Sequence, residues 1–100
     1  MIDVEERINQ VVALVREALA PHRIILFGSR ARRTAARGSD IDLAVEGVPK
    51  LSVREERVLR EKIDETAGLL SVDLLFLDDV GDEDMKRVVK ETGVVVYEKK

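Results

Sequence analysis

Two short groups of residues carry the types and spacing that could do chemistry. Gly28-Ser29 is followed, after ten intervening residues, by Asp40-Ile41-Asp42. A small-residue turn with a hydroxyl suits a phosphate chain, and two acids that alternate along a strand suit a pair of divalent cations. Together the two groups indicate chemistry on a nucleoside triphosphate.

The turn at Gly28 and Ser29 is predicted to join a buried strand to a short helix. Free backbone N–H groups and the helix dipole favour an anion at such a helix start. Gly28 lets the backbone approach closely because it has no Cβ, and Ser29 can donate a hydroxyl hydrogen bond to a phosphate. Positive charge is normally disfavoured there, so Arg30, Arg32 and Arg33 favour a nearby polyanion. The alternative is that Ser29 only caps the helix and the arginines are solvated.

Asp40 and Asp42 are predicted to share one face of a strand, since residues i and i+2 point the same way about 6.6 Å apart. Two like charges on one face repel, and cations remove that penalty. Carboxylate oxygens suit Mg²⁺, and two such ions can clamp the attacking and leaving oxygens of a phosphoryl displacement. The alternative is a solvated strand end whose acids contact nothing.

Asp73 is a charge within the strand-like run 71–76. If that strand lies beside the strand of the aspartate pair, Asp73 can point to the same face. A third carboxylate there could complete a metal site and accept a proton from an incoming hydroxyl. The alternative is an edge-strand acid that deters aggregation. Asp78 and Asp79 follow the same strand and are interpreted as turn residues.

Hydrophobic spacing predicts the elements that must position these residues. Helix–strand alternation indicates an α/β (α+β) fold with a small mixed sheet of about four strands flanked by helices. Ser52 to Glu55 fits a capping box at the start of a helix that places Leu59, Ile63 and Ala67 on one face. Helices are expected at about 3–20, 29–37, 52–67 and 83–91, and strands at 23–27, 40–46, within 69–77 and at 94–97.

The composition sets the class of protein. One hundred residues with 45% hydrophobic content predict a single domain over 1–100. A net charge of -3 and three aromatic residues argue against nucleic-acid binding. The absence of cysteine excludes disulfides and thiolate metal sites. No apolar run is long enough to span a bilayer and the first residues lack a signal-peptide pattern, so a cytoplasmic protein is expected.

The combined motif of Gly28-Ser29 and Asp40-Ile41-Asp42 resembles the signature of the polymerase-β-like nucleotidyltransferase superfamily. Three segments are similar in sequence to its minimal nucleotidyltransferase (MNT) branch, namely residues 27–32, the strand at 72–74 and the closing segment 92–98. The resemblance covers nearly the whole chain. Arg33 departs from the glycine that is common in the branch, which changes the helix surface rather than a ligand.

The resemblance implies a role for each matching residue. Asp40 and Asp42 would bind two Mg²⁺ ions, and Asp73 would help to bind metal and activate the acceptor hydroxyl. The expected site is therefore nucleotide-binding at Gly28, Ser29 and Arg30, and both catalytic and metal-binding at Asp40, Asp42 and Asp73.

The resemblance also implies transfer of a nucleoside monophosphate, expected to be AMP from ATP, with pyrophosphate leaving. In the MNT branch the acceptor is often a HEPN-domain toxin, and the small protein is its antitoxin. A chain of 100 residues leaves little room for an acceptor-binding domain, so the acceptor is expected from another subunit or a separate protein. The alternative function is a non-catalytic antitoxin that neutralises its toxin by binding, with an idle or regulatory nucleotide site. The three acids and the turn together favour the enzyme.

Overall fold

Helices and strands alternate along the residues that the computed structural model describes, which are 4–28, 41–68 and 70–99. None of the helices within these ranges combines the length and the apolar character needed to cross a membrane. The elements are α1 (Val4–Leu19), β1 (Arg23–Phe27), β2 (Ile41–Glu46), α2 (Val53–Ala67), β3 (Val72–Phe76), the 3-10 turn η1 (Leu77–Asp79), α3 (Glu83–Thr92) and β4 (Val94–Glu98). The predicted helix at 29–37 lies outside the described residues.

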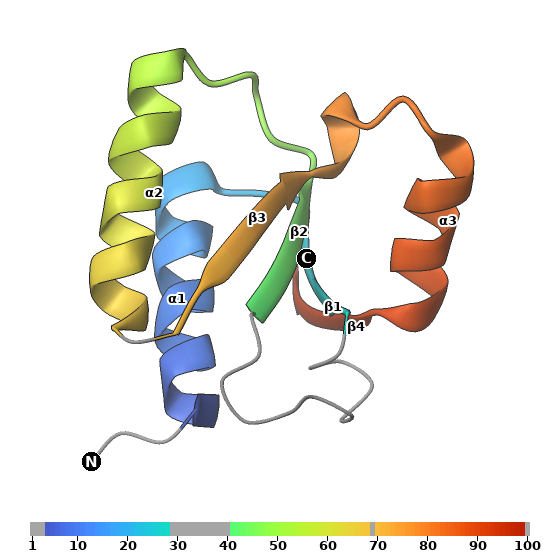
Figure 1. The fold of residues 1–100 in the computed structure, drawn as a ribbon. Helices are drawn as coiled ribbons and strands as arrows, with labels where there is room; N and C mark the ends of the chain where they lie inside the picture. Colours follow the sequence, from blue (N-terminus) through green and yellow to red (C-terminus); the bar gives the residue numbers. More distant parts are fainter. Residues whose placement is uncertain (1–3, 29–40, 69, 100) are drawn as a thin grey trace.

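The four strands form one mixed sheet in the order β3-β2-β1-β4. β1 pairs antiparallel with both β2 and β4, whereas β2 and β3 are parallel and are joined through α2. Helices α1 and α2 cover one face of the sheet and α3 lies on the other (Figure 1). This arrangement confirms the predicted class, a small mixed sheet flanked by helices.

Alternation along β2 assigns its side chains to the two faces. Ile41 and Leu43 are fully buried in the main core, which packs α1 and α2 against the sheet. Ala44 belongs to a second, smaller core that also contains Val89 of α3. Because successive residues of a strand point to opposite faces, Asp42 lies on the α3 face with Ala44. The predicted apolar stripe of α2 is confirmed, since Leu59, Ile63 and Ala67 are all buried.

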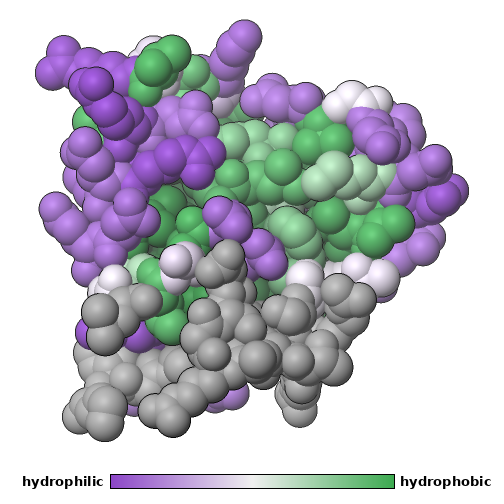
Figure 2. All heavy atoms as spheres, viewed as in Figure 1, coloured by the Kyte–Doolittle hydropathy of each residue, from purple (hydrophilic) through white to green (hydrophobic). Residues whose placement is uncertain are grey.

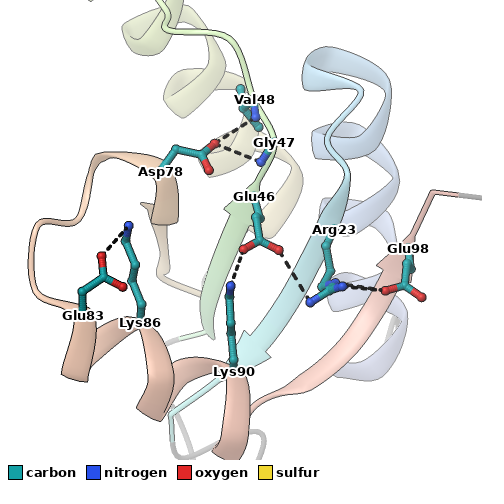
Figure 3. Close-up of polar contacts among 9 residues, drawn as sticks. All are labelled: Arg23, Glu46, Gly47, Val48, Asp78, Glu83, Lys86, Lys90 and Glu98. Atoms are coloured by element: carbon teal, nitrogen blue, oxygen red, sulfur yellow. Dashed lines mark hydrogen bonds and ion pairs between the residues drawn. The ribbon is translucent and has the colours of Figure 1, made fainter.

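A network of charged side chains fixes α3 to the far end of this face (Figure 3). Lys90 of α3 forms an ion pair of 2.7 Å with Glu46, the last residue of β2. Arg23 lies between Glu46, at 3.6 Å, and Glu98 of β4, at 3.0 Å. The network therefore links α3 to three strands at the opposite end of β2 from Asp42.

The capping box predicted at the start of α2 is confirmed. The Ser52 hydroxyl accepts a hydrogen bond from the Glu55 backbone N–H (3.1 Å), and the Glu55 carboxylate accepts one from the Ser52 N–H (3.0 Å). The backbone hydrogen bond from Ser52, followed by the bond with its side chain, lowers the pKa of Glu55 below its usual value. The box satisfies two N–H groups that a helix start otherwise leaves without partners.

Candidate active site

Asp42 and Asp73 are direct neighbours across the pairing of β2 and β3. The two residues are Cα partners in the parallel register. Paired strands lie about 4.8 Å apart and residues directly opposite share a face, so both carboxylates are on the α3 face of the sheet. Asp42 is half-buried and Asp73 is exposed. The predicted strand for Asp73 therefore does lie beside that of Asp42, and the two acids face the same side.

Gly28 closely approaches the carboxylate of Asp42. A Cβ built on Gly28 would overlap Oδ2 of Asp42 and would lie 3.3 Å from its Cγ. Gly28 also has a φ of +75°, in the left-handed region that favours glycine. Space and conformation together thus require glycine at this position, and they place the turn after β1 against the first acid.

The site occupies one row across the sheet. Phe27, the last residue of β1, is the register partner of Asp42, which in turn pairs with Asp73. The next row on the same face is apolar and consists of Ile25, Ala44 and Leu75. The acids therefore lie at one end of the sheet, between the Gly28 turn and an apolar surface.

Three of the predicted site residues, Ser29, Arg30 and Asp40, lie outside the described residues. Among the described ones, no group of three or more His, Cys, Asp or Glu side chains could hold a metal. The structure thus brings together Gly28, Asp42 and Asp73, which are the predicted site residues that it describes.

Sequence reasoning did not single out Phe27 and Leu75, the half-buried apolar residues that border the acids. A signal for Leu75 was present, because period-two alternation from Asp73 puts Leu75 on the same face of the strand. The position of Phe27 opposite Asp42 depends on the register between β1 and β2, which the sequence pattern does not define.

The donor set suits a hard divalent cation. Directly opposed carboxylates destabilise a sheet, and no ion pair joins Asp73 to any residue in the described ranges. Mg²⁺ typically takes one or two carboxylates and completes its shell with phosphates and water. Two carboxylate side chains, one of them exposed, fit that preference.

Comparison with solved structures finds close similarity in fold. The chain is 28% identical to a chain from a toxin–antitoxin complex with AMP-PNP, with a TM-score of 0.74 over 92% of this chain and 73% of that one. A second match, from a tri-AMPylated Shewanella oneidensis HEPN toxin in complex with MNT antitoxin, is 22% identical with a TM-score of 0.73, covering 97% of this chain and 74% of that one. No curated protein matches the chain.

A family model matches nearly all of the sequence. The model is that of the polymerase beta nucleotidyltransferase domain, and it covers residues 9–100. The matched range contains the glycine turn, the acid pair and the third acid that the motif predicted. The chain belongs to the polymerase beta nucleotidyltransferase family.

Proposed function

We propose that this protein is a Mg²⁺-dependent nucleotidyltransferase that moves AMP from ATP to a hydroxyl of a HEPN-domain toxin. The observation that carries the proposal is the close approach of Gly28 to Asp42, together with the position of Asp42 beside Asp73 on one face of the sheet. It places a close backbone approach suited to phosphate beside two carboxylates suited to magnesium. Few structural roles would need opposed acids at this position.

The triphosphate would lie at Gly28, with Ser29 and Arg30 as further contacts. Asp40, Asp42 and Asp73 would hold magnesium, which when bound supplies positive charge to the transferring phosphate and the leaving pyrophosphate. These assignments follow the motif and the observed neighbours Gly28 and Asp42.

Asp73 is the acid available to the acceptor, because it is exposed and belongs to β3, one of the two edge strands of the sheet. In the proposed step its carboxylate accepts the proton of the acceptor hydroxyl. The acceptor oxygen forms a bond to the α-phosphorus. The bond from that phosphorus to the oxygen bridging to the β-phosphorus breaks, and pyrophosphate leaves.

The choice of AMP and of a toxin as acceptor rests on the similar proteins. One of them was crystallised as a toxin–antitoxin complex with AMP-PNP, and another as an antitoxin with a tri-AMPylated HEPN toxin. By this likeness, we infer that the protein acts as the antitoxin of a HEPN-domain toxin.

The test is an incubation of the protein with magnesium, labelled ATP and that toxin. We expect label on the toxin, and a loss on the order of a hundredfold or more in Asp42→Ala, because a metal ligand is removed. Absence of transfer by the wild type, with full toxin neutralisation by Asp42→Ala, would instead support an antitoxin that acts by binding alone.

A further inference from the structure

We propose that Ser71 is a second acceptor of the adenylyl group, so that the protein modifies itself when no toxin is bound. The inference rests on the proposed function, because it uses the same acids and the same ATP. Ser71 comes just before β3 and belongs to neither of the two residue groups that indicated the site. Its modification would make the activity of the site depend on the supply of toxin.

Ser71 lies on the same face of the sheet as Asp73. The N–H of Ile41 in β2 donates a hydrogen bond of 2.8 Å to the backbone oxygen of Ser71, which continues the parallel pairing to the residue before β3. Val72, between the two residues, packs on the main core, so Ser71 and Asp73 both point to the α3 face. Positions i and i+2 of a strand are about 6.6 Å apart, so rotation of the side chains can bring the Ser71 hydroxyl to the carboxylate, directly or through one water.

Both side chains are open to solvent. Ser71 and Asp73 are exposed, and β3 is an edge strand of the sheet. β3 crosses the front of the molecule in Figure 1, and Figure 2 shows an uncovered surface on this side, apolar near its centre with hydrophilic residues around it. The Ser71 hydroxyl is therefore not held in a core and can turn toward the carboxylate.

Ser71 differs from the other hydroxyl side chains in the described ranges. These lie on α2 and its cap, on α3 and on β4, and are Ser52, Thr66, Thr92 and Tyr97. The hydroxyl of Thr92 already donates a hydrogen bond of 2.6 Å to the backbone oxygen of Val88, and Tyr97 packs against the main core on the opposite face. A general base acts on a hydroxyl within its reach, so Ser71 is the acceptor that Asp73 can serve among the described residues.

The step has the same balance as transfer to the toxin. The Asp73 carboxylate accepts the proton of the Ser71 hydroxyl, and the Ser71 oxygen forms a bond to the α-phosphorus of ATP. The bond from that phosphorus to the oxygen bridging to the β-phosphorus breaks, and pyrophosphate leaves. The product is a negatively charged phosphodiester that joins Ser71 to adenosine. Its charge and bulk beside Asp42 and Asp73 should hinder the binding of another ATP.

The backbone of Ser71 indicates that this reaction is the slower one. The hydrogen bond from Ile41 fixes the Ser71 carbonyl to β2, so the hydroxyl moves only by rotation of its own side chain. The displacement requires the attacking oxygen roughly in line with the leaving oxygen, and a misplacement of about 1 Å can cost about a hundredfold in rate. We expect self-transfer to be on the order of a hundredfold slower than transfer to the toxin.

The experiment incubates the protein alone with magnesium and ATP labelled at the α-phosphate. We expect label on the protein, located at Ser71 by mass spectrometry of its peptides. Ser71→Ala should lose this label, whereas Ser71→Thr should keep it because a hydroxyl remains. Ser52→Ala is the matched control, since it removes a hydroxyl at the start of α2, and it should be labelled like the wild type under conditions in which it is folded. Wild-type protein kept with ATP and magnesium should then label added toxin more slowly than fresh protein, and Ser71→Ala should show no such loss.

The outcomes separate this inference from the proposed function. A wild type that labels the toxin but never itself would overturn the inference and leave the proposed function intact. Label that persists in Ser71→Ala, or that is located at another residue, would also overturn it. Label at Ser71 without label on the toxin would support the inference and refute the toxin as acceptor. Label on neither protein would refute both.

Discussion

Asp42 and Asp73 lie directly opposite each other in the parallel pair β2–β3 and face the same side of the sheet. Without a cation their repulsion should cost a few tenths to about 1 kcal/mol of folding free energy. Asp73→Asn should therefore raise the thermal unfolding temperature in EDTA at low salt. Added magnesium should stabilise the wild type, and it should stabilise Asp73→Asn less, because that variant keeps Asp40 and Asp42 but loses the third proposed ligand.

The control for this measurement is Glu61→Gln, which removes an exposed negative charge from α2. It should preserve the response of the wild type to magnesium. A magnesium response in Asp73→Asn equal to that of the wild type would remove Asp73 from the metal site.

Gly28→Ala should disrupt the site more than the fold. The added Cβ would collide with the Asp42 carboxylate and would require a left-handed backbone conformation. We expect a stability loss of about 1–2 kcal/mol, from the cost of that conformation in a non-glycine residue. Magnesium-dependent ATP binding, followed by calorimetry, should fall below detection. Retention of wild-type ATP affinity in a folded Gly28→Ala protein would contradict the close approach described for this turn.

In the charged network at the far end of the α3 face, Glu46 should contribute more to folding stability than Lys90. Glu46 contacts both Lys90 and Arg23, whereas Lys90 contacts only Glu46 in this network. Glu46→Gln should thus destabilise the protein more than Lys90→Met, each by no more than about 1 kcal/mol because the groups are partly exposed. Both effects should shrink at high salt. A larger loss in Lys90→Met, by chemical denaturation, would show that Glu46 is not the centre of the network.

Ser52→Ala should destabilise α2 by about 1 kcal/mol at neutral pH, because the helix loses its N-cap. The carboxylate half of the box is tested by Glu55→Ala, because the backbone N–H of residue 52 would still be present in Ser52→Ala. The pKa of Glu55 is lowered by its hydrogen bonds with Ser52, so the contribution of the carboxylate is present above the usual pKa of a glutamate and is lost as the pH falls through the lowered pKa. The difference in unfolding free energy between wild type and Glu55→Ala should therefore shrink in acid. A difference independent of pH would show that the charge of the Glu55 carboxylate takes no part in the cap.

Much of the fold could be predicted from local patterns. The stripe of Leu59, Ile63 and Ala67 identified α2 and its buried side, and the Ser52 capping box identified its start. The strand ends could also be predicted from the sequence, since β1 ends before Gly28 and β4 begins after Gly93. These features depend on residues close together in the sequence.

Which strands lie side by side in the sheet was harder to predict from the sequence. Whether Asp73 shares a face with Asp42 depends on β3 packing beside β2 through the α2 crossover, which no local pattern defines. Asp78 illustrates the same limit. It is a turn residue, as predicted, but its carboxylate accepts hydrogen bonds from the N–H groups of Gly47 and Val48, some thirty residues away (Figure 3). Long-range pairings of this kind require the tertiary structure.

Nucleotidyl transfer at these acids is tested most directly with two positions of label in ATP. The toxin is incubated with this protein, magnesium and ATP labelled at either the α- or the γ-phosphate. We expect the α-label on the toxin and the γ-label in the released pyrophosphate, and we expect Asp42→Asn and Asp73→Asn to abolish the transfer. Label from the γ-phosphate on the toxin, or transfer that persists in both variants, would contradict nucleotidyl transfer at these acids.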